Sequence, residues 1–330
     1  MPRRRDILAG AVALGVSPLL HGPARAGDAW SAFLAAHERS GRVIDDFSGL
    51  SHSEGQGFAM RLAVHHGDRA AFERLWSWTG RELARDDGLF AWSWRDGQIA
   101  DRNNASDGDI TIAWALLEAA QRWRREEWRT AGLRTAQAVR ELLTVERDGR
   151  LLLLPGGEGF REKDGLVVNP SYWVFPALDA FAAIEGSPAW RRLADAGTAL
   201  LAETSGAYGL APDWLELPAN LAWKQRPRAS YDAIRVPLWL LWSGRAGPQP
   251  ERWLAFLENV GRAWIDSRSG ALADYGLGIE QRSVLLLLRR WRGDGDVTLA
   301  GLPLVGTETS YYGAIIRLLV AAAWLERFGY

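Results

Sequence analysis

Three short stretches of the chain place carboxylates where an apolar run with helical spacing begins. In the first stretch, 51–57, Glu54 follows a serine and precedes two glycines, Gly55 and Gly57. A serine before a glutamate is typical of a helix N-terminus, where the helix dipole favours an ionised side chain. The glycines favour a ligand site instead, because they let the backbone approach a ligand closely and weaken a merely structural first turn. Glu54 is therefore a candidate both for a helix cap and for a site residue.

The second stretch, 101–109, precedes the apolar run 110–123. Asp107 and Asp109 have the position of residues that cap this helix. A calcium-binding loop is the more specific alternative. Ala105 and Ser106, however, occupy positions where the EF-hand pattern requires an oxygen ligand and a glycine. We therefore expect no metal site here.

The third stretch, 230–237, contains Asp232 and Arg235 three residues apart. This spacing is that of an ordinary ion pair on a helix surface, which contributes a few tenths of a kcal/mol. Pro237 indicates, however, that the helix is kinked or begins irregularly. Because helices broken beside charged groups often serve sites, Asp232 is a second candidate for chemistry.

The elements that carry these residues are predicted to be mainly helices, because apolar residues recur at helical spacing and sustained alternation is scarce. Short strands or hairpins are expected around 145–160. Helices are too numerous for a four-helix bundle, and the absence of repeats disfavours an open solenoid. We therefore expect one all-α domain over 27–330, with paired helices in a closed ring. Eleven or twelve helices are expected, near 29–38, 54–66, 69–85, 108–124, 126–143, 172–184, 187–203, 231–243, 249–267, 277–291 and 309–328.

The composition limits the classes of partner that the protein can be expected to bind. The chain has 330 residues, and its 48% hydrophobic content is enough for a large core. With 39 basic and 40 acidic residues the net charge is −1, so there is no basic field for nucleic acid. The 18 tryptophans outnumber the 10 phenylalanines and 7 tyrosines, which is consistent with an aromatic-lined cleft. About two thirds of the tryptophans are nevertheless expected in the core.

Residues 1–26 are predicted to be an export signal. Three arginines at 3–5 precede an apolar stretch at 7–20, and Ala24-Arg25-Ala26 supplies a small-x-small cleavage pattern. The paired arginines resemble a twin-arginine signal, although Sec export and an uncleaved membrane anchor are alternatives. The chain has no cysteine, so its stability in an oxidising compartment cannot depend on disulfides. We expect a periplasmic or secreted protein with no stable membrane insertion after signal cleavage.

Motifs along residues 28–328 resemble those of glycoside hydrolase family 8. The stretch 105–109 and the apolar positions after it match the family signature, while 53–56 and 231–235 match two further motifs in the expected order. The segments 91–94 and 169–173 are also similar to family segments. The resemblance is strongest to the periplasmic endoglucanases encoded with bacterial cellulose synthases. It implies an (α/α)6 barrel, inverting endo-hydrolysis of β-1,4-linked glycans and no cofactor.

The resemblance also implies roles for individual residues. Glu54 would be the general acid and Asp232 the general base, the two groups needed to protonate a leaving oxygen and to activate a water. Burial or the charge of Asp107 would have to raise the pKa of Glu54, and Arg235 would help to keep Asp232 ionised. The remaining substrate-binding residues implied are Asp107, Trp92, Trp94, Tyr172 and Arg235.

The aromatic pair carries an expectation of its own, and two other positions depart from the family pattern. Trp92 and Trp94 lie two apart, and we expect at most one of them to face the core, leaving the other free for a sugar ring. Phe58 stands where many family members have tyrosine, so any hydrogen bond of that hydroxyl is missing here. Pro237 stands where the cellulose-linked members often have a larger residue.

Together these observations predict an exported endo-β-1,4-glucanase that acts on cellulose and is linked to bacterial cellulose biosynthesis. Its expected partners are β-1,4-glucan chains and a cellulose synthase complex. Xylan, chitosan and mixed-linkage glucan are alternative substrates within the family. The alternative from another functional class is a non-catalytic glucan-binding or scaffold protein of a cellulose export machine, which the presence of both carboxylates disfavours.

Overall fold

The computed structural model describes residues 26–163, 165–204, 206–218 and 227–329. All but the last residue of the predicted export signal lies outside these ranges. The eleven expected helices are all present in the described part of the chain: α1 (Ala26–His37), α2 (Ser53–His66), α3 (Arg69–Glu82), α4 (Ser106–Trp123), α5 (Glu126–Leu142), α6 (Phe175–Glu185), α7 (Pro188–Glu203), α8 (Arg235–Ser243), α9 (Gln249–Asn259), α10 (Ile279–Arg292) and α11 (Tyr311–Phe328).

Two helix boundaries differ clearly from the prediction. Helix α8 begins at Arg235 rather than near residue 231, because residues 231–234 form a turn. Pro237 is the third residue of this helix, where a missing backbone N–H costs little. The expected irregular start is therefore confirmed. Helix α9 ends at Asn259, and the chain then forms strand β12 (Ile265–Asp266) instead of continuing as helix.

The strands are short and lie in loops between the helices. The expected hairpin around 145–160 is present as β6 (Thr144–Arg147) and β7 (Arg150–Leu153). The periodicity did not predict the sheet β3-β4-β5 (Ser51–His52, Ala91–Arg95, Gln98–Asn104). The other strands are β1 (Glu38–Arg39), β2 (Arg42–Val43), β8 (Arg161–Glu162), β9 (Gly165–Val168), β10 (Leu215–Leu217) and β11 (Arg228–Ala229).

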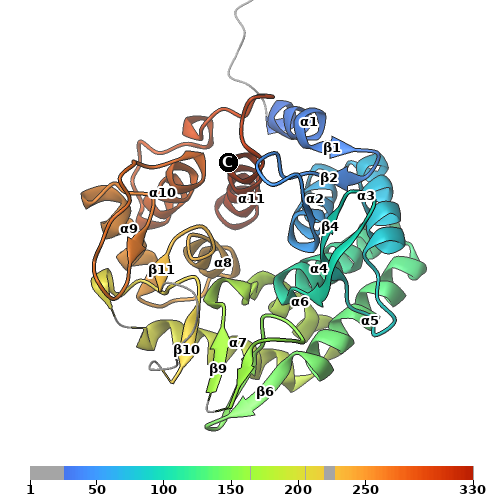
Figure 1. Cartoon of the computed structure of the whole chain (residues 1–330). Coiled ribbons are helices and arrows are strands. Elements are labelled where there is room, and N and C mark those ends of the chain that lie inside the picture. Colours follow the sequence, from blue (N-terminus) through green and yellow to red (C-terminus); the bar gives the residue numbers. More distant parts are fainter. Residues whose placement is uncertain (1–25, 164, 205, 219–226, 330) are drawn as a thin grey trace, which may run out of the picture.

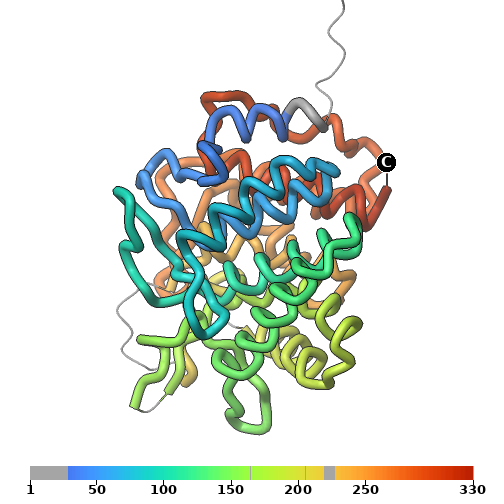
Figure 2. The backbone as a smooth tube through the Cα atoms, turned by 90° about the vertical axis from the view of Figure 1, so that its right-hand side faces the viewer, coloured from blue at the N-terminus to red at the C-terminus, as the bar shows by residue number. Residues whose placement is uncertain are grey.

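The helices form a closed ring of paired layers (Figure 1). Helices α2, α4, α6, α8 and α11 contact one another in that order. All of them except α6 are buried on nearly all sides. Amphipathic helices such as α3, α5, α7 and α9 cover them from outside, each packed on the inner helix beside it in the chain. The tube in Figure 2 shows the same two layers from the side. The predicted single all-helical domain is confirmed.

The ring closes where α11 packs against α2, so that the end of the chain meets its beginning. The buried guanidinium of Arg61 on α2 lies 2.8 Å from Glu326 on α11 and 3.1 Å from Glu118 on α4. It also lies over the ring of Trp114, with 4.3 Å between Cζ and the ring centroid. A buried charge of this kind is tolerated only with such partners. The three helices are therefore tied together at one end of the barrel.

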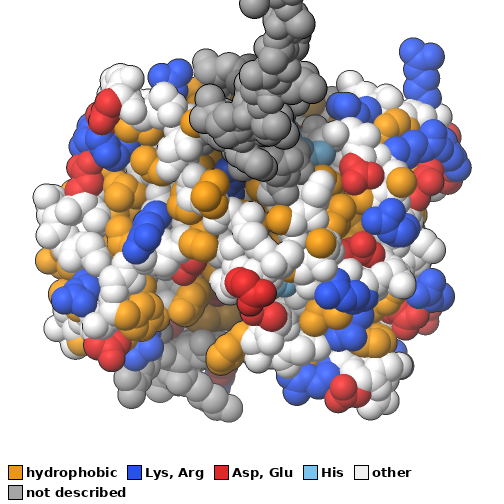
Figure 3. Space-filling model, turned by 90° about the horizontal axis from the view of Figure 1, so that it is seen from above, with side chains coloured by type: hydrophobic (Ala, Val, Ile, Leu, Met, Phe, Trp, Pro, Cys, Tyr) orange, Lys and Arg blue, Asp and Glu red, His pale blue; other side chains and the backbone are white. Residues whose placement is uncertain are grey.

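Most of the described tryptophans belong to the core, as expected. Seventeen of the 18 tryptophans lie in the described ranges, and ten of these are buried. The face seen in Figure 3 carries charges of both signs interspersed. None of the described helices is long and apolar enough to cross a membrane. The ten buried tryptophans are Trp30, Trp78, Trp114, Trp128, Trp173, Trp190, Trp239, Trp242, Trp253 and Trp324.

One of these side chains depends on a glycine. The ring of Trp173 is buried against Gly197 of α7 and donates a hydrogen bond to the carbonyl of Leu193 at 3.0 Å. A Cβ on Gly197 would lie 2.6 Å from Nε1 of Trp173. Because Trp173 directly follows the 3-10 turn η1 (Pro170–Tyr172), this contact also fixes the segment that carries Tyr172.

We expect Gly197→Ala to destabilise the protein by about 1–3 kcal/mol, because the added methyl overpacks a buried ring. Thermal unfolding followed by circular dichroism measures the effect. The matched control is Gly295→Ala, since no atom lies within 4 Å of a Cβ built there. Equal melting temperatures for the two variants would show that Trp173 can shift without cost.

Candidate active site

The candidate site is built around the guanidinium of Arg235, which is fully buried. Its Nη1 donates to Oε1 of Glu54 at 2.6 Å and to Oδ2 of Asp107 at 3.1 Å. Its Nη2 donates to Oδ1 of Asp232 at 2.7 Å and to Oγ of Ser171 at 2.9 Å. One side chain thus contacts all three carboxylates that the sequence singled out.

The inner helices bring these residues together. Glu54 and Asp107 are each the second residue of an inner helix, α2 and α4, and Arg235 is the first residue of α8. Asp232 lies in the turn that precedes α8. The ring places these helix starts at one end of the barrel, although Glu54 and Arg235 are 181 positions apart.

Glu54 does not act as a helix cap. The N-cap residue of α2 is His52, which makes no side-chain cap bond, and the carboxylate of Glu54 turns to Arg235. Burial raises the pKa of Glu54, the charge of Asp232 adds to this, and Arg235 opposes it. Burial is thus one of the two expected causes, while the added charge comes from Asp232 rather than Asp107. The site favours the protonated form that a general acid requires.

Neither Asp107 nor Asp109 is the N-cap residue of α4, which is Ala105, although Oδ1 of Asp107 accepts the first-turn N–H of Gly108 at 2.8 Å. Asp107 is buried beside Arg235, and burial together with the charge of Glu54 raises its pKa well above the ordinary value. Asp109 points away and accepts bonds from the backbone N–H of Phe90 and the amide of Asn104, at 2.8 and 2.6 Å. Burial raises the pKa of Asp109 to about 7. It therefore anchors β4 and β5 beside the site.

Asp232 is the most open of the three carboxylates, with 28% of its side chain exposed. Its Oδ2 accepts a bond from Nδ2 of Asn169 at 2.8 Å. Oδ1 of Asn169 in turn accepts bonds from the backbone N–H and the hydroxyl of Ser171. Sequence reasoning missed Asn169 and Ser171, although both lie in the segment 169–173 that resembled the family. Only its aromatic residue, Tyr172, was singled out there.

Aromatic rings flank the carboxylates. The centroid of the Tyr172 ring lies 5.7 Å from Cζ of Arg235, and Trp214 meets this ring edge-on. Tyr311 and Tyr312 at the start of α11 were not predicted as site residues. Burial raises the pKa of both well above the ordinary value, and the charge of Glu54 acts in the same direction.

At most one of Trp92 and Trp94 was expected to face the core, and the structure agrees with this expectation. Both rings are half-buried, but only Trp94 packs against the hydrophobic core, and the strand is irregular between Ser93 and Trp94. Trp94 packs edge-on against Trp78 and lies under the guanidinium of Arg42. Trp92 stacks on His52, with 5.8 Å between the ring centroids. Of the two, Trp92 is the better placed to meet a ligand.

The interpretation of Gly55 and Gly57 as positions where the backbone approaches a ligand closely was wrong. A Cβ on Gly55 would collide with the hydroxyl of Tyr311, and one on Gly57 would lie 3.0 Å from the backbone nitrogen of Ile112. These glycines allow α11 and α4 to approach α2 closely. They therefore position Glu54 through helix packing.

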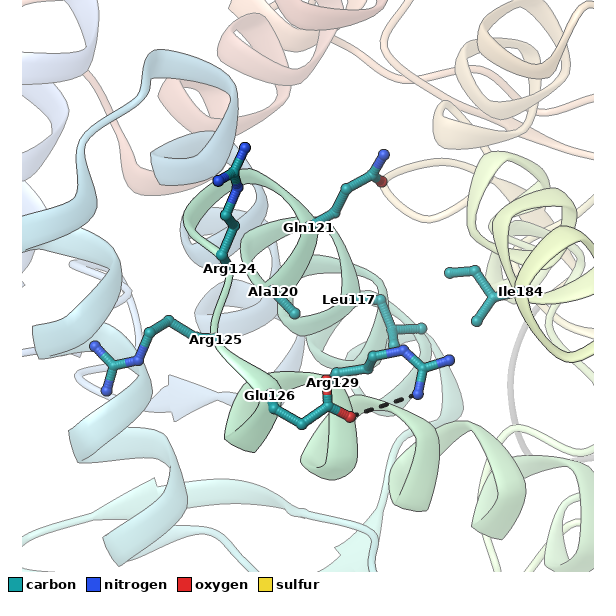
Figure 4. Close-up of a pocket in the computed structure, with 8 residues that line it drawn as sticks. All are labelled: Leu117, Ala120, Gln121, Arg124, Arg125, Glu126, Arg129 and Ile184. Atoms are coloured by element: carbon teal, nitrogen blue, oxygen red, sulfur yellow. Dashed lines mark ion pairs between the residues drawn. The ribbon is translucent and has the colours of Figure 1, made fainter.

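A separate hollow of about 590 Å³ lies at the opposite end of α4 (Figure 4). Arg124, Arg125 and Arg129 line it, and Arg129 pairs with Glu126 at 3.6 Å. None of the candidate catalytic groups reaches it. Within the described ranges, no group of three or more histidine, cysteine, aspartate or glutamate side chains is arranged to hold a metal ion.

We expect Arg235→Lys to lower turnover by about 100-fold, because an ammonium cannot bind all four oxygens and small displacements of catalytic groups cost rate. Steady-state hydrolysis of a soluble glycan measures the loss. The control is Arg245→Lys, which alters a pair with Asp179 at the surface, where Nη2 and Oδ1 are 2.6 Å apart. Wild-type turnover in Arg235→Lys would show that catalysis does not require the guanidinium.

Comparisons with known proteins find endoglucanases similar to this chain in sequence and in fold. An endoglucanase from Cellulomonas uda is 39% identical over 264 residues, which cover 76% of this chain and 74% of the relative. A probable endoglucanase from Novacetimonas hansenii is 34% identical over 314 residues, 90% of each protein. The solved structure of an endo-β-1,4-glucanase from Acetobacter xylinum has a TM-score of 0.85 and 33% identity, covering 93% of this chain and 99% of that one.

This similarity confirms the predicted (α/α)6 barrel. The family model of glycosyl hydrolases family 8 matches residues 7–323, nearly the whole chain. The match includes every segment that contributes to the cluster around Arg235. The chain belongs to glycosyl hydrolase family 8.

Proposed function

We propose that this protein is an exported endo-β-1,4-glucanase that hydrolyses cellulose with inversion, Glu54 acting as the general acid and Asp232 as the general base. The observation that carries this proposal is the cluster in which one buried guanidinium contacts both carboxylates. The endoglucanases among its relatives support the substrate class. Two observations support the assignment of roles. Burial raises the pKa of Glu54, and the side chain of Asp232 is more exposed to water than that of Glu54, 28% against 21%.

The mechanism follows from these two environments. Protonated Glu54 donates its proton to the oxygen of the scissile glycosidic bond, which makes the departing sugar a neutral alcohol. Asp232, held by Arg235 and Asn169, removes a proton from a water that attacks the opposite face of the sugar ring. Asp107 binds sugar hydroxyls at the cleavage point beside them. Trp92 and Tyr172 contribute aromatic surface along the cleft, and Trp94 supports the wall from behind.

The place of the enzyme in the cell belongs to the same proposal. The charged and apolar segments of residues 1–26 favour export, after which the enzyme would act in the periplasm or outside the cell. The resemblance to endoglucanases encoded with cellulose synthases favours nascent cellulose as the substrate and the synthase complex as a partner. Product profiles on cellohexaose, xylohexaose and chitosan oligomers test the substrate, and release from cellohexaose alone is expected.

We expect Glu54→Gln to lower turnover by about 10² to 10⁴, because an amide cannot replace the acid, while the melting temperature is preserved. Reducing-sugar release from carboxymethylcellulose measures the effect. Glu118→Gln is the matched control, since Glu118 is also a partly buried glutamate paired with an arginine. Glu118 lies near the C-terminal end of α4, whereas the site lies at the N-terminal end of this helix. A loss below tenfold in Glu54→Gln would exclude Glu54 as the acid.

We expect the first product released from cellopentaose to be the α-anomer, because a water that attacks opposite the leaving group inverts a β-linkage. Proton NMR of the anomeric signals within the first minutes, before mutarotation, distinguishes the two outcomes. An initial β-anomer would require a nucleophile in place of a base at Asp232.

A further inference from the structure

A fourth carboxyl group, Asp213, supports the turn that carries Asp232, and the mechanism above does not use it. Asp213 lies just before β10, and its Oδ1 accepts the backbone N–H of Ser230 at 2.9 Å and that of Ala233 at 2.8 Å. Its own N–H donates to the carbonyl of Arg228 at 2.6 Å. The two bonds of the carboxyl enclose Tyr231 and Asp232 between them.

These bonds satisfy donors that the turn cannot satisfy itself. Residues 230–234 turn into α8 with bonds from Ile234 to Ser230 and from Arg235 to Asp232, while the first N–H groups of such a turn have no internal partner. The N-cap residue of α8, Ile234, has no side chain able to accept them. Asp213 therefore serves as a cap supplied from a segment 17 to 20 positions earlier in the chain.

The position of the base is sensitive to this cap. The side chain of Asp232 reaches Arg235 and Asn169 from the middle of the turn. The guanidinium of Arg235 is also held by Glu54 and Asp107, so a loosened turn would displace Asp232 relative to it. We propose that Asp213 is a positioning residue that holds Asp232 in the geometry needed to activate water.

The charge state of Asp213 supports a role as hydrogen-bond acceptor. Burial, followed by the charge of Asp232, raises its pKa to about 8, although its backbone bonds and Arg235 act in the opposite direction. The charged groups that face it are Asp232 and Arg235, and Glu54 and Asp107 lie beyond that guanidinium. At pH values well below 8, Asp213 is therefore mostly neutral. An asparagine, which is neutral at every pH and keeps an acceptor oxygen, should replace it.

The test compares variants of the full chain on cellohexaose. We expect Asp213→Asn to keep kcat and KM within about twofold of the wild type. Asp213→Leu removes the acceptor at similar volume, and should lower kcat about tenfold or more while KM changes little, because the base contributes to the chemical step. Asp68→Leu is the control, since Asp68 caps α3 by accepting the N–H of Ala71 far from the site. It should lower the melting temperature without lowering kcat.

A second measurement follows from linkage. An aspartate whose pKa is raised on folding stabilises the folded protein less and less as the pH rises from about 4 to 8. An asparagine has no such pH dependence. The melting temperature of Asp213→Asn relative to the wild type should therefore rise between pH 5 and pH 8. A difference that stays constant over this range would contradict a neutral Asp213.

The outcomes separate this inference from the proposed function on which it rests. A wild type that cleaves cellohexaose, together with a leucine variant of unchanged kcat and lowered melting temperature, would make Asp213 merely structural and overturn the positioning role alone. A tenfold loss of kcat in Asp213→Asn would overturn it as well. If the leucine variant does not fold, Asp213→Ala replaces it with the same expectation. Inactivity of the wild type on all the oligomers would overturn the proposed function, and this inference with it.

Discussion

The site depends on a single interaction, the contact of one buried guanidinium with three carboxylates from three parts of the chain. Only arginine has enough donors in a fixed planar array to bind Glu54, Asp107, Asp232 and the hydroxyl of Ser171 together. A buried cation with no partners would be costly, so the three carboxylates and Arg235 require one another. The cation thereby holds the starts of α2, α4 and α8 at one point.

The charges in this cluster do not balance, and the imbalance has a chemical use. Three carboxylates around one guanidinium leave an excess of negative charge that a poorly solvated site disfavours. Binding protons relieves the excess, and the groups with raised pKa values are the enclosed ones, Glu54 and Asp107. Asp232 is the most exposed of the three carboxylates. The cluster thus raises the pKa of the residue proposed as the acid, as that role requires.

Much of this arrangement could be predicted from the sequence, and the failures have physical reasons. The helices were predictable because their apolar periodicity extends over many residues, whereas β3, β4 and β5 are short and one of their interior residues is bulged. The start of α8 was misplaced because its turn is capped by Asp213, a residue from another segment. Asn169 and Ser171 were missed because neither is charged and neither belongs to a periodic apolar pattern. Their role is visible only in the structure, where Asn169 lies beside Asp232. Gly55 and Gly57 were recognised as unusual from the sequence, but the groups that approach them closely belong to α11 and α4 and not to a ligand.

The closure of the ring by α11 has a consequence for when the enzyme becomes active. The wall beside Glu54 includes Tyr311, and the tie between Arg61 and Glu326 joins α2 to the last described turns of the chain. A chain that ends before α11 would contain every catalytic carboxylate and yet leave α2 without its neighbour. We expect the enzyme to become active only when α11 has packed against α2, because this helix supplies both Tyr311 and the partner of Arg61. A helix that carries none of the catalytic carboxylates is thus required for the activity.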